Sequence, residues 1–276
     1  MRLFNKVAVI GTGLIGGSLA LFIKKNKLAG EVVGVARHKA SLNLALKMKA
    51  IDRGSLSLGI IKGADFLILA TPVDLIIGLR KKILKIAGKN CLVTDVGSTK
   101  GKIVALLEKD FPNFVGSHPL AGSEKHGILN AHPDIFKDSL CVLTPTRRTS
   151  MKALSKIKKL WLRTGARVAL LSPDEHDRAL SFTSHLAHIV AFSLINSVPL
   201  SFLKLSAGGL KDTTRIASSA PLLWQGIFLT NRKNLLRAVN SFEGNLQKIK
   251  GAIIKNDKKL LTNILKQAQN KRSLIE

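Results

Sequence analysis

The chain has 276 residues, of which 46% are hydrophobic, so it is long enough for two domains and a sizeable core. Its formal net charge is +27 at pH 7, but the basic residues are spread along the chain, which argues against a nucleic-acid-binding protein. Such a charge either steers anionic ligands or reflects solvated lysine-rich helix faces. Cys91 and Cys141 form no metal or redox motif, and an apolar run follows the first residues directly. We therefore expect no signal peptide and a cytoplasmic location.

The first strand-like run, residues 6–10, leads into a glycine-rich turn. The turn reads Gly11, Thr12, Gly13, Leu14, Ile15 and Gly16. It opens an amphipathic segment at residues 14–28, and a second strand-like run follows at residues 31–35. In dinucleotide-binding βαβ units the first glycine permits the tight turn, the second lets the backbone approach a pyrophosphate, and the third lets helix and strand pack closely. This context predicts that the six turn residues bind a dinucleotide.

The second strand-like run lacks the acidic residue that usually follows it. In such units an acidic side chain about 20 residues after the glycines binds the ribose 2′-hydroxyl of NAD. Here the run continues into Ala36, Arg37 and His38. A planar guanidinium suits a 2′-phosphate, so we expect Arg37 and His38 to favour NADP. The alternative is that Arg37 is solvated and that NAD binds without the carboxylate.

Strand-like runs alternate with amphipathic segments as far as about residue 172. The runs are residues 6–10, 31–35, 65–70, 91–96, 114–117, 139–144 and 167–171, and the amphipathic segments include 14–28, 39–50, 73–87 and 151–164. This alternation predicts an α/β fold with a doubly wound, mostly parallel sheet of the Rossmann type. Residues 173–276 read as helices only. We expect a dinucleotide-binding domain over residues 1–172 and a helical domain over residues 173–276.

One stretch of the helical part, residues 179–203, lacks Asp, Glu, Lys and Arg and is long enough to span a bilayer. Its histidines, serines, threonine, asparagine and proline favour a buried helix of a soluble domain instead, so we expect no membrane contact.

Three strand-like runs end in small and polar residues. Thr71 and Pro72 follow the run at residues 65–70, residues 95–102 close the run at 91–96, and residues 116–124 close the run at 114–117. Ligands of such sheets bind beyond the carboxyl ends of the strands. We therefore expect these three segments to converge on the nicotinamide end of the cofactor.

His118 is the candidate catalytic base. It follows a strand-like run and precedes Pro119, which fixes the backbone. An imidazole with an ordinary pKa of about 6.5 suits the removal of a hydroxyl proton while hydride leaves the same carbon. Ser98, beside Gly97, would hydrogen-bond that hydroxyl or orient the imidazole. The alternative is that His118 is an ordinary turn residue.

The helical part carries a second polar group. Ser181, Ser184, His185 and His188 share one helix face, and His176 precedes them. The two histidines at i and i+3 suit a metal, but no carboxylate or cysteine is spaced to complete a site, so we expect a polar pocket wall and no metal.

Further along, Arg215 is a candidate clamp for a substrate carboxylate, and Trp224 would form a wall of the same pocket. The alternatives are a surface ion pair for Arg215 and a plain core position for Trp224.

Five segments together carry a resemblance to a known family. They are GTGLIGGS (11–18), DVGSTK (95–100), HPLAGSE (118–124), SHLAH (184–188) and GGLKDTTR (208–215). In this collinear order the chain resembles the prephenate/arogenate dehydrogenases of tyrosine biosynthesis. The resemblance implies oxidative decarboxylation of prephenate to 4-hydroxyphenylpyruvate with hydride transfer to NAD or NADP. The arogenate reaction, which gives tyrosine directly, is the alternative.

The resemblance also implies roles for single residues. His118 would accept the hydroxyl proton with Ser98 as its companion, and Arg215 would clamp a carboxylate. The remaining implied pocket residues are His188, Ser123, Glu124, His185, His176 and Trp224. The small anionic substrate would bind between the two domains of a homodimer that forms through the helical domain.

Two other interpretations stay open at this point. Another two-domain 3-hydroxyacid-type or imino-acid dehydrogenase shares the glycine motif and a helical second domain. A nucleotide sensor or basic nucleic-acid binder without turnover would account for the net charge.

Overall fold

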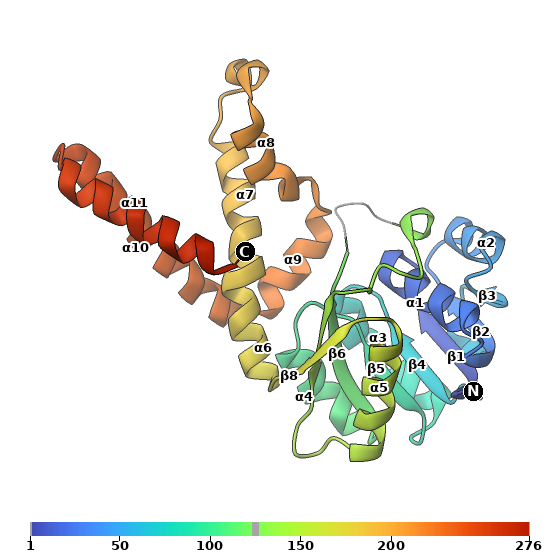
Figure 1. The fold of residues 1–276 in the computed structure, drawn as a ribbon. Helices are drawn as coiled ribbons and strands as arrows, with labels where there is room; N and C mark the ends of the chain where they lie inside the picture. Colours follow the sequence, from blue (N-terminus) through green and yellow to red (C-terminus); the bar gives the residue numbers. More distant parts are fainter. Residues whose placement is uncertain (1, 123–126, 276) are drawn as a thin grey trace. The chain divides into compact units, whose positions relative to one another are not determined.

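The computed structural model describes residues 2–122 and 127–275 and contains an eight-stranded sheet in the order β3-β2-β1-β4-β5-β6-β7-β8 (Figure 1). The strands are β1 (Phe4–Ile10), β2 (Ala29–Val35), β3 (Arg53–Ser55), β4 (Phe66–Leu69), β5 (Leu92–Asp95), β6 (Phe114–Leu120), β7 (Leu140–Thr144) and β8 (Arg167–Leu170). Every neighbouring pair is parallel except β6 and β7, which are antiparallel. The predicted doubly wound, mostly parallel sheet is confirmed.

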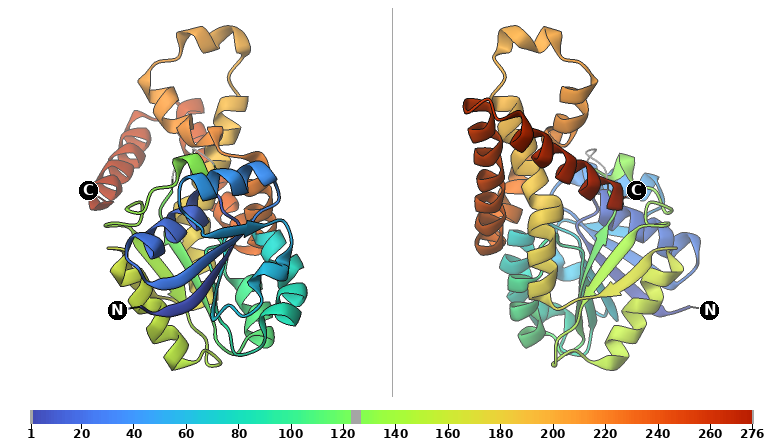
Figure 2. Two further views of the ribbon diagram at one scale, coloured as in Figure 1. Left: turned by 90° about the vertical axis from the view of Figure 1, so that its right-hand side faces the viewer. Right: turned by 60° about the vertical axis from the view of Figure 1, so that its left-hand side comes forward.

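Helices cover both faces of this sheet. They are α1 (Leu14–Lys25), α2 (Lys39–Lys47), α3 (Val73–Ala87), α4 (Gly101–Asp110) and α5 (Met151–Arg163), with short 3₁₀ turns η1 (Leu58–Ile61) and η2 (Ile128–Asn130). Figure 2 shows the sheet between α5 on one side and α3 and α4 on the other. The connections between parallel strands return over one face or the other, as parallel strands require.

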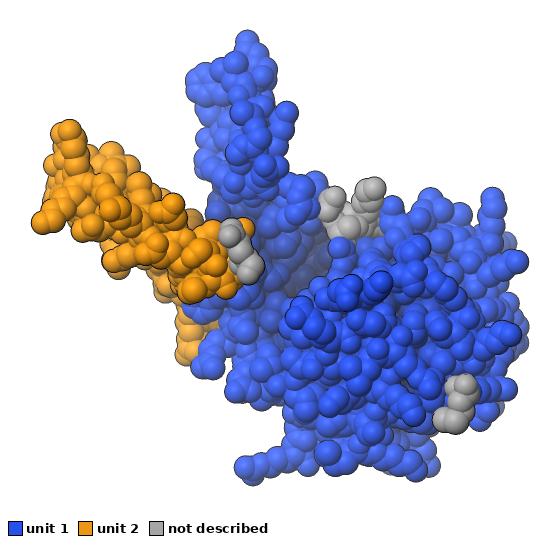
Figure 3. All heavy atoms as spheres, in the orientation of Figure 1, with its two compact units in different colours: residues 1–231 blue, residues 232–276 orange. Residues whose placement is uncertain are grey.

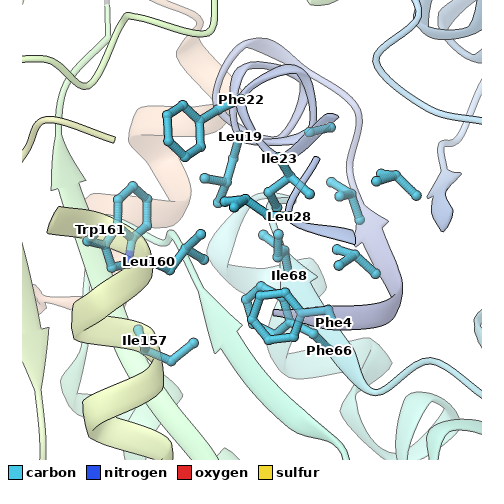
Figure 4. Packing of buried hydrophobic residues seen from close by; sticks show 14 of the residues in the cluster. Phe4, Leu19, Phe22, Ile23, Leu28, Phe66, Ile68, Ile157, Leu160 and Trp161 are labelled. Atoms are coloured by element: carbon cyan, nitrogen blue, oxygen red, sulfur yellow. The ribbon is translucent and has the colours of Figure 1, made fainter. Parts of the chain in front are cut away.

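The core consists of two apolar clusters, one on each face, and β1 contributes to both. Val7 and Val9 belong to the cluster with α1 and α5, whereas Ala8 and Ile10 belong to the cluster with α3 and α4. Figure 4 shows the first cluster, in which Trp161 of α5 lies near residues of α1. Residues 7–10 of β1 are buried on both sides, which explains why the sequence shows a continuous apolar run there.

Two strands differ from the prediction. The sequence suggested that His118 and Pro119 follow a strand. Instead, β6 continues to Leu120, so both residues lie within it. The extension exists because antiparallel β7 supplies partners, with His118 opposite Val142 and Leu120 opposite Leu140. The three-residue β3 was not predicted, because a short polar edge strand has no apolar run.

The chain after β8 is helical, as predicted. The elements are α6 (Pro173–Leu180), a π-helical turn η3 (Ser181–His185), α7 (Leu186–Asn196), η4 (Leu200–Leu205), α8 (Gly208–Thr214), η5 (Arg215–Ser218) and α9 (Pro221–Thr230). Ser172 begins α6 with a capping box: its hydroxyl accepts from the Glu175 amide, and the Glu175 carboxylate accepts from the Ser172 amide.

The elements α6, η3 and α7 form one helix, Pro173–Asn196, which is long and apolar enough to cross a membrane by length and composition alone. Only 22% of the most apolar 18-residue stretch of this helix is buried, so the prediction of a buried helix is wrong for a single chain. The physical reason is that only one face of the helix is buried, and that face combines the apolar Leu180 and Ala191 with polar residues. Ser181 and His185 are buried, whereas Phe182 is 46% exposed.

Residues 1–231 form one compact unit and residues 232–276 a second (Figure 3). The second unit consists of α10 (Arg232–Ile254), α11 (Lys258–Arg272) and the terminal turn η6 (Ser273–Ile275). α10 and α11 pack against each other, and Asp257 caps α11 by accepting from the Leu260 amide. The domains predicted over residues 1–172 and 173–276 stay a prediction.

Candidate active site

The glycine turn after β1 has the geometry of a dinucleotide cradle. Gly11 has φ +101°, and a Cβ there would lie 2.5 Å from the Ala70 carbonyl oxygen. A Cβ at Gly16 would lie 2.1 Å from the Gly11 carbonyl oxygen, whereas a Cβ at Gly13 would meet nothing within 4 Å. The chain itself therefore requires the first and third glycines. The second leaves open space on the side from which a pyrophosphate would approach.

The N-terminus of α1 suits the same ligand. Gly13 is its N-cap without a side-chain hydrogen bond, and no acidic residue lies in its first turn. The first-turn amides of a helix have no intrahelical acceptor and attract an anion. Thr12 is buried, and Leu14 and Ile15 are half-buried beside this end. The residues present therefore fit a nicotinamide dinucleotide.

The neighbouring strand ends complete the nucleotide edge. Arg37 and His38 are exposed directly after β2, and His38 is the N-cap of α2. Thr71, half-buried, and Pro72, the N-cap of α3, follow β4. Because β2 and β4 pair with β1 on either side, these residues and the glycine turn share one edge of the sheet.

A buried ion pair at the end of β5 also contacts the middle of β6. Lys100 and Asp95 are both fully buried, and Lys100 Nζ donates to the Asp95 carboxylate and, at 2.7 Å, to the Ser117 carbonyl. The carboxylate also accepts from the amides of Gly97 at 2.8 Å and Ser117 at 3.3 Å. Such satisfaction of every polar atom is what makes a buried charge pair tolerable.

His118 belongs to a chain of side chains that reaches into α6. Its Nδ1 lies 2.8 Å from His176 Nε2, and His176 Nδ1 lies 2.9 Å from Asp177 Oδ1. The Asp177 carboxylate also accepts from the amides of Lys100 at 2.7 Å and Gly101 at 2.8 Å. His118, from β6, is thereby connected to the first residues of α4.

Burial sets the protonation of this chain. Burial lowers the pKa of His118 well below its usual value, and repulsion between protonated His118 and His176, together with the charge of Lys100, lowers it further. Burial also lowers the pKa of His176. Burial opposes the ionised form of Asp177, but hydrogen bonds from His176 and the α4 amides outweigh it and lower its pKa. At neutral pH both imidazoles are therefore neutral and Asp177 is ionised.

A second group of rings involves the helix Pro173–Asn196, which also carries His176 and Asp177. His188 stacks on Trp224 with ring centroids 3.4 Å apart, and His185 contacts the same indole edge-on at 6.1 Å. Asn231 Nδ2 donates to the Asp177 carbonyl at 2.7 Å and lies 3.2 Å from His185 Nδ1. Burial lowers the pKa of His185 to about 4. His185 is thus joined to His118 through Asn231, Asp177 and His176, whereas His188 contacts this group through Trp224.

Other predicted residues have looser ties to this group. Ser98 is half-buried after β5, and its backbone carbonyl faces His185, while the Nδ1 of His118 is directed to His176. Arg215 is exposed at the start of η5, which packs against α7, the helix that carries His188. The roles of Ser98 and Arg215 stay predictions.

Ser123 and Glu124 lie outside the described residues. Within residues 2–122 and 127–275, no cluster of three His, Cys, Asp or Glu side chains is placed to hold a metal ion.

The sequence reasoning did not find Asp177, Asn231 or the Asp95–Lys100 pair. Asp177 directly follows His176, so a histidine–aspartate dipeptide in the first turns of a helix was an available signal. Asn231 had none, because its role depends on a contact with residues 46 and 54 positions away.

Comparisons with known proteins match this chain over nearly its whole length. The family domain described as "Prephenate dehydrogenase, nucleotide-binding domain" matches residues 19–170, and "Prephenate dehydrogenase, dimerization domain" matches residues 172–267. The prephenate dehydrogenase of Bacillus subtilis is 36% identical over 97% of this chain and 75% of its own length. The cyclohexadienyl dehydrogenase of Zymomonas mobilis is 32% identical over 99% of this chain and 96% of its own.

Solved structures agree. Prephenate dehydrogenase from A. aeolicus, in complex with hydroxyphenyl propionate and NAD+, has a TM-score of 0.93 and 35% identity, and the match covers 99% of this chain and 98% of that one. A (S)-3-hydroxybutyryl-CoA dehydrogenase from Ralstonia eutropha, at 19% identity and a TM-score of 0.53, shares the fold alone. With its nucleotide cradle, its buried histidine chain and these matches, the chain belongs to the prephenate dehydrogenase family.

Proposed function

We propose that this protein oxidises prephenate to 4-hydroxyphenylpyruvate and carbon dioxide, with a nicotinamide dinucleotide as hydride acceptor. The names of the relatives from Bacillus subtilis and A. aeolicus support this substrate. The observation that carries the proposal is the state of His118: its imidazole is neutral, and its Nδ1 is engaged by His176. Its Nε2 is then available to a substrate hydroxyl.

The reaction balances without any other oxidant. A bound nicotinamide cofactor would supply the acceptor for the hydride that leaves the ring carbon bearing the hydroxyl. His118 Nε2 takes the hydroxyl proton as the carbonyl forms. The bond to the ring carboxylate then breaks, carbon dioxide leaves, and its electron pair makes the ring aromatic. His118 returns the proton to the phenol oxygen, so the imidazole ends neutral.

The other residues hold the reactants. Arg215 clamps a substrate carboxylate by charge-assisted hydrogen bonds. Ser98 hydrogen-bonds the reacting hydroxyl, and His188, held against Trp224, lines the ring pocket. Positioning of this kind can lower the activation barrier by as much as about 7–11 kcal/mol.

The cofactor preference rests on the end of β2. The exposed Arg37 and His38 favour the 2′-phosphate of NADP, and no carboxylate follows β2 to hold a 2′-hydroxyl. The relative from A. aeolicus was solved with NAD+, which makes NAD the alternative.

The protein acts as a cytoplasmic homodimer that forms through the helical part. The match to a dimerization domain over residues 172–267 supports this, as does the exposed apolar surface there. Leu200, Phe202, Leu205 and Leu222 are each at least 59% exposed in the single chain. A second copy of this part would cover such surface.

A specific observation also favours arogenate as a second candidate substrate. A solved arogenate dehydrogenase from Synechocystis has a TM-score of 0.82 and 27% identity over 98% of this chain. The two substrates differ only in a keto or amino group on the side chain.

The test is a set of initial rates with prephenate and arogenate, each with NAD and NADP, followed at the nicotinamide absorbance. We expect the largest kcat/KM with prephenate and NADP. A larger value with arogenate reassigns the substrate, a larger value with NAD reassigns the cofactor, and no turnover with any pair refutes the proposal.

A further inference from the structure

The hydrogen-bond chain from Asp177 to His118 has a direction that the donor and acceptor rules determine. An ionised carboxylate only accepts, so the proton between Asp177 Oδ1 and His176 Nδ1, 2.9 Å apart, belongs to the histidine. A neutral imidazole carries one proton, so His176 Nε2 presents a lone pair. The contact of 2.8 Å to that nitrogen requires His118 to donate from Nδ1. His118 is therefore left with an unprotonated Nε2.

This direction matters because the two neutral tautomers of His118 behave differently. With the proton on Nδ1, Nε2 accepts a proton from a substrate hydroxyl. With the proton on Nε2, the same atom can only donate, and the ring cannot act as a base from that position. The partner of the other ring nitrogen sets the tautomer.

Asp177 is itself held in place by the main chain. Its two oxygens accept from the Lys100 and Gly101 amides, at the N-terminus of α4, and its backbone carbonyl accepts from Asn231. α4 packs against α6, the helix that carries both Asp177 and His176 (Figure 1). His176 is fully buried and Asp177 is 5% exposed, so neither side chain has room to change partners.

We propose that Asp177 and His176 are positioning residues that hold His118 in the tautomer protonated on Nδ1, with Nε2 directed at the substrate. Both ring nitrogens of His176 are occupied, so it acts through His118 and binds no substrate atom itself. The Asp177 charge also stabilises the imidazolium that forms on His118 when it takes the proton. The tautomer follows from the structure alone, and only its catalytic use rests on the proposed function.

The direct test is 15N NMR of the protein with labelled histidines, because protonated and unprotonated ring nitrogens have well separated shifts. His118 is assigned by comparison with the spectrum of a His118→Asn variant. We expect His118 Nδ1 in the protonated range and Nε2 in the unprotonated range at neutral pH. The opposite pattern in the wild-type protein overturns the proposal, whether or not any variant folds.

Two substitutions separate positioning from packing. His176→Phe keeps the ring volume and removes the acceptor, so we expect the His118 tautomer to shift toward a proton on Nε2. In His176→Gln the amide oxygen can accept from His118, so we expect the wild-type tautomer to be retained. The control is His132→Gln, an exposed histidine whose side chain lies near Asp134. An unchanged His118 tautomer in a folded His176→Phe variant overturns the proposal.

Kinetics provide the catalytic readout. We expect His176→Phe to lower kcat by about 10²-fold, the lower end of what general-base catalysis contributes, with KM near that of the wild type. His176→Gln should recover most of the loss. A wild-type kcat in His176→Phe refutes a catalytic role for the hydrogen bonds from Asp177 through His176 to His118. An enzyme that turns over none of the four substrate and cofactor pairs, yet shows the expected tautomer, refutes the proposed function alone.

Discussion

Replacement of Lys100 by methionine tests the buried ion pair on which the site is built. The side chains of Lys100 and Asp95 are fully buried, and Lys100 Nζ donates to Asp95 and to the Ser117 carbonyl. Removing one partner of a buried pair costs about 3–5 kcal/mol, because the other charge is left uncompensated. Asp95 keeps its hydrogen bonds from the Gly97 and Ser117 amides. We therefore expect a loss near 3 kcal/mol in the free energy of unfolding.

The loss should depend on pH in a defined direction. Burial raises the pKa of Asp95, and Lys100 opposes that rise. Without the cation the pKa of Asp95 rises further, so the folded variant takes up a proton more readily than the folded wild type. The destabilisation is then largest at alkaline pH and shrinks as the pH falls through the raised pKa of Asp95.

The assay is urea unfolding of Lys100→Met, Asp95→Asn and the double variant at pH 8 and pH 5, followed by circular dichroism. The double variant leaves no unpaired charge, so its loss should be smaller than the sum of the two single losses by about 0.5–3 kcal/mol. A loss below about 1 kcal/mol at pH 8 for Lys100→Met, or losses that add without coupling, would show that the pair is not what holds the end of β5 against β6.

Four further substitutions test the cofactor and substrate ends. Gly16→Ala should lower Tm strongly, since its Cβ would meet the Gly11 carbonyl at 2.1 Å, whereas Gly13→Ala should leave Tm unchanged and weaken cofactor binding in calorimetry. Equal effects of the two would argue against the cradle. Arg37→Ser should raise KM for NADP and leave KM for NAD nearly unchanged, and a parallel change in both constants would remove Arg37 from 2′-phosphate recognition. Arg215→Ala should raise KM for prephenate by about tenfold or more, because one charge-assisted hydrogen bond contributes about 1.5–3 kcal/mol. An unchanged KM would contradict the role of Arg215 as a carboxylate clamp.

The parts of the fold that follow from local chemistry were predictable. Residues 7–10 of β1 are apolar because both faces of the strand are covered there, and the glycine spacing after the strand is a local motif, although the contact that requires Gly11 comes from Ala70 at the end of β4. The end of β6 was not predictable, because β7 arrives from elsewhere in the sequence and pairs with His118 and Leu120. The π-helical turn at Ser181–His185 likewise has no signature in the spacing of residues.

The candidate site shows the same division. His118 was recognisable from the apolar run before it and from Pro119 after it, and His185 and His188 lie together, as their spacing suggested, with Trp224 against both. The partner of His118 was not predictable, because the strand position of one imidazole says nothing of which helix packs over it. His176 reaches His118 only through the fold of α6 against the ends of the sheet, 58 residues further along the chain.

The most direct measurement of the central claim is the turnover of a His118→Asn variant, with saturating prephenate and cofactor and with circular dichroism to show that it is folded. If His118 Nε2 takes the hydroxyl proton, kcat falls by about 10²–10⁴ while Tm stays that of the wild type. A folded variant with wild-type kcat would contradict the claim, because the proton would then leave by a route that does not involve this imidazole.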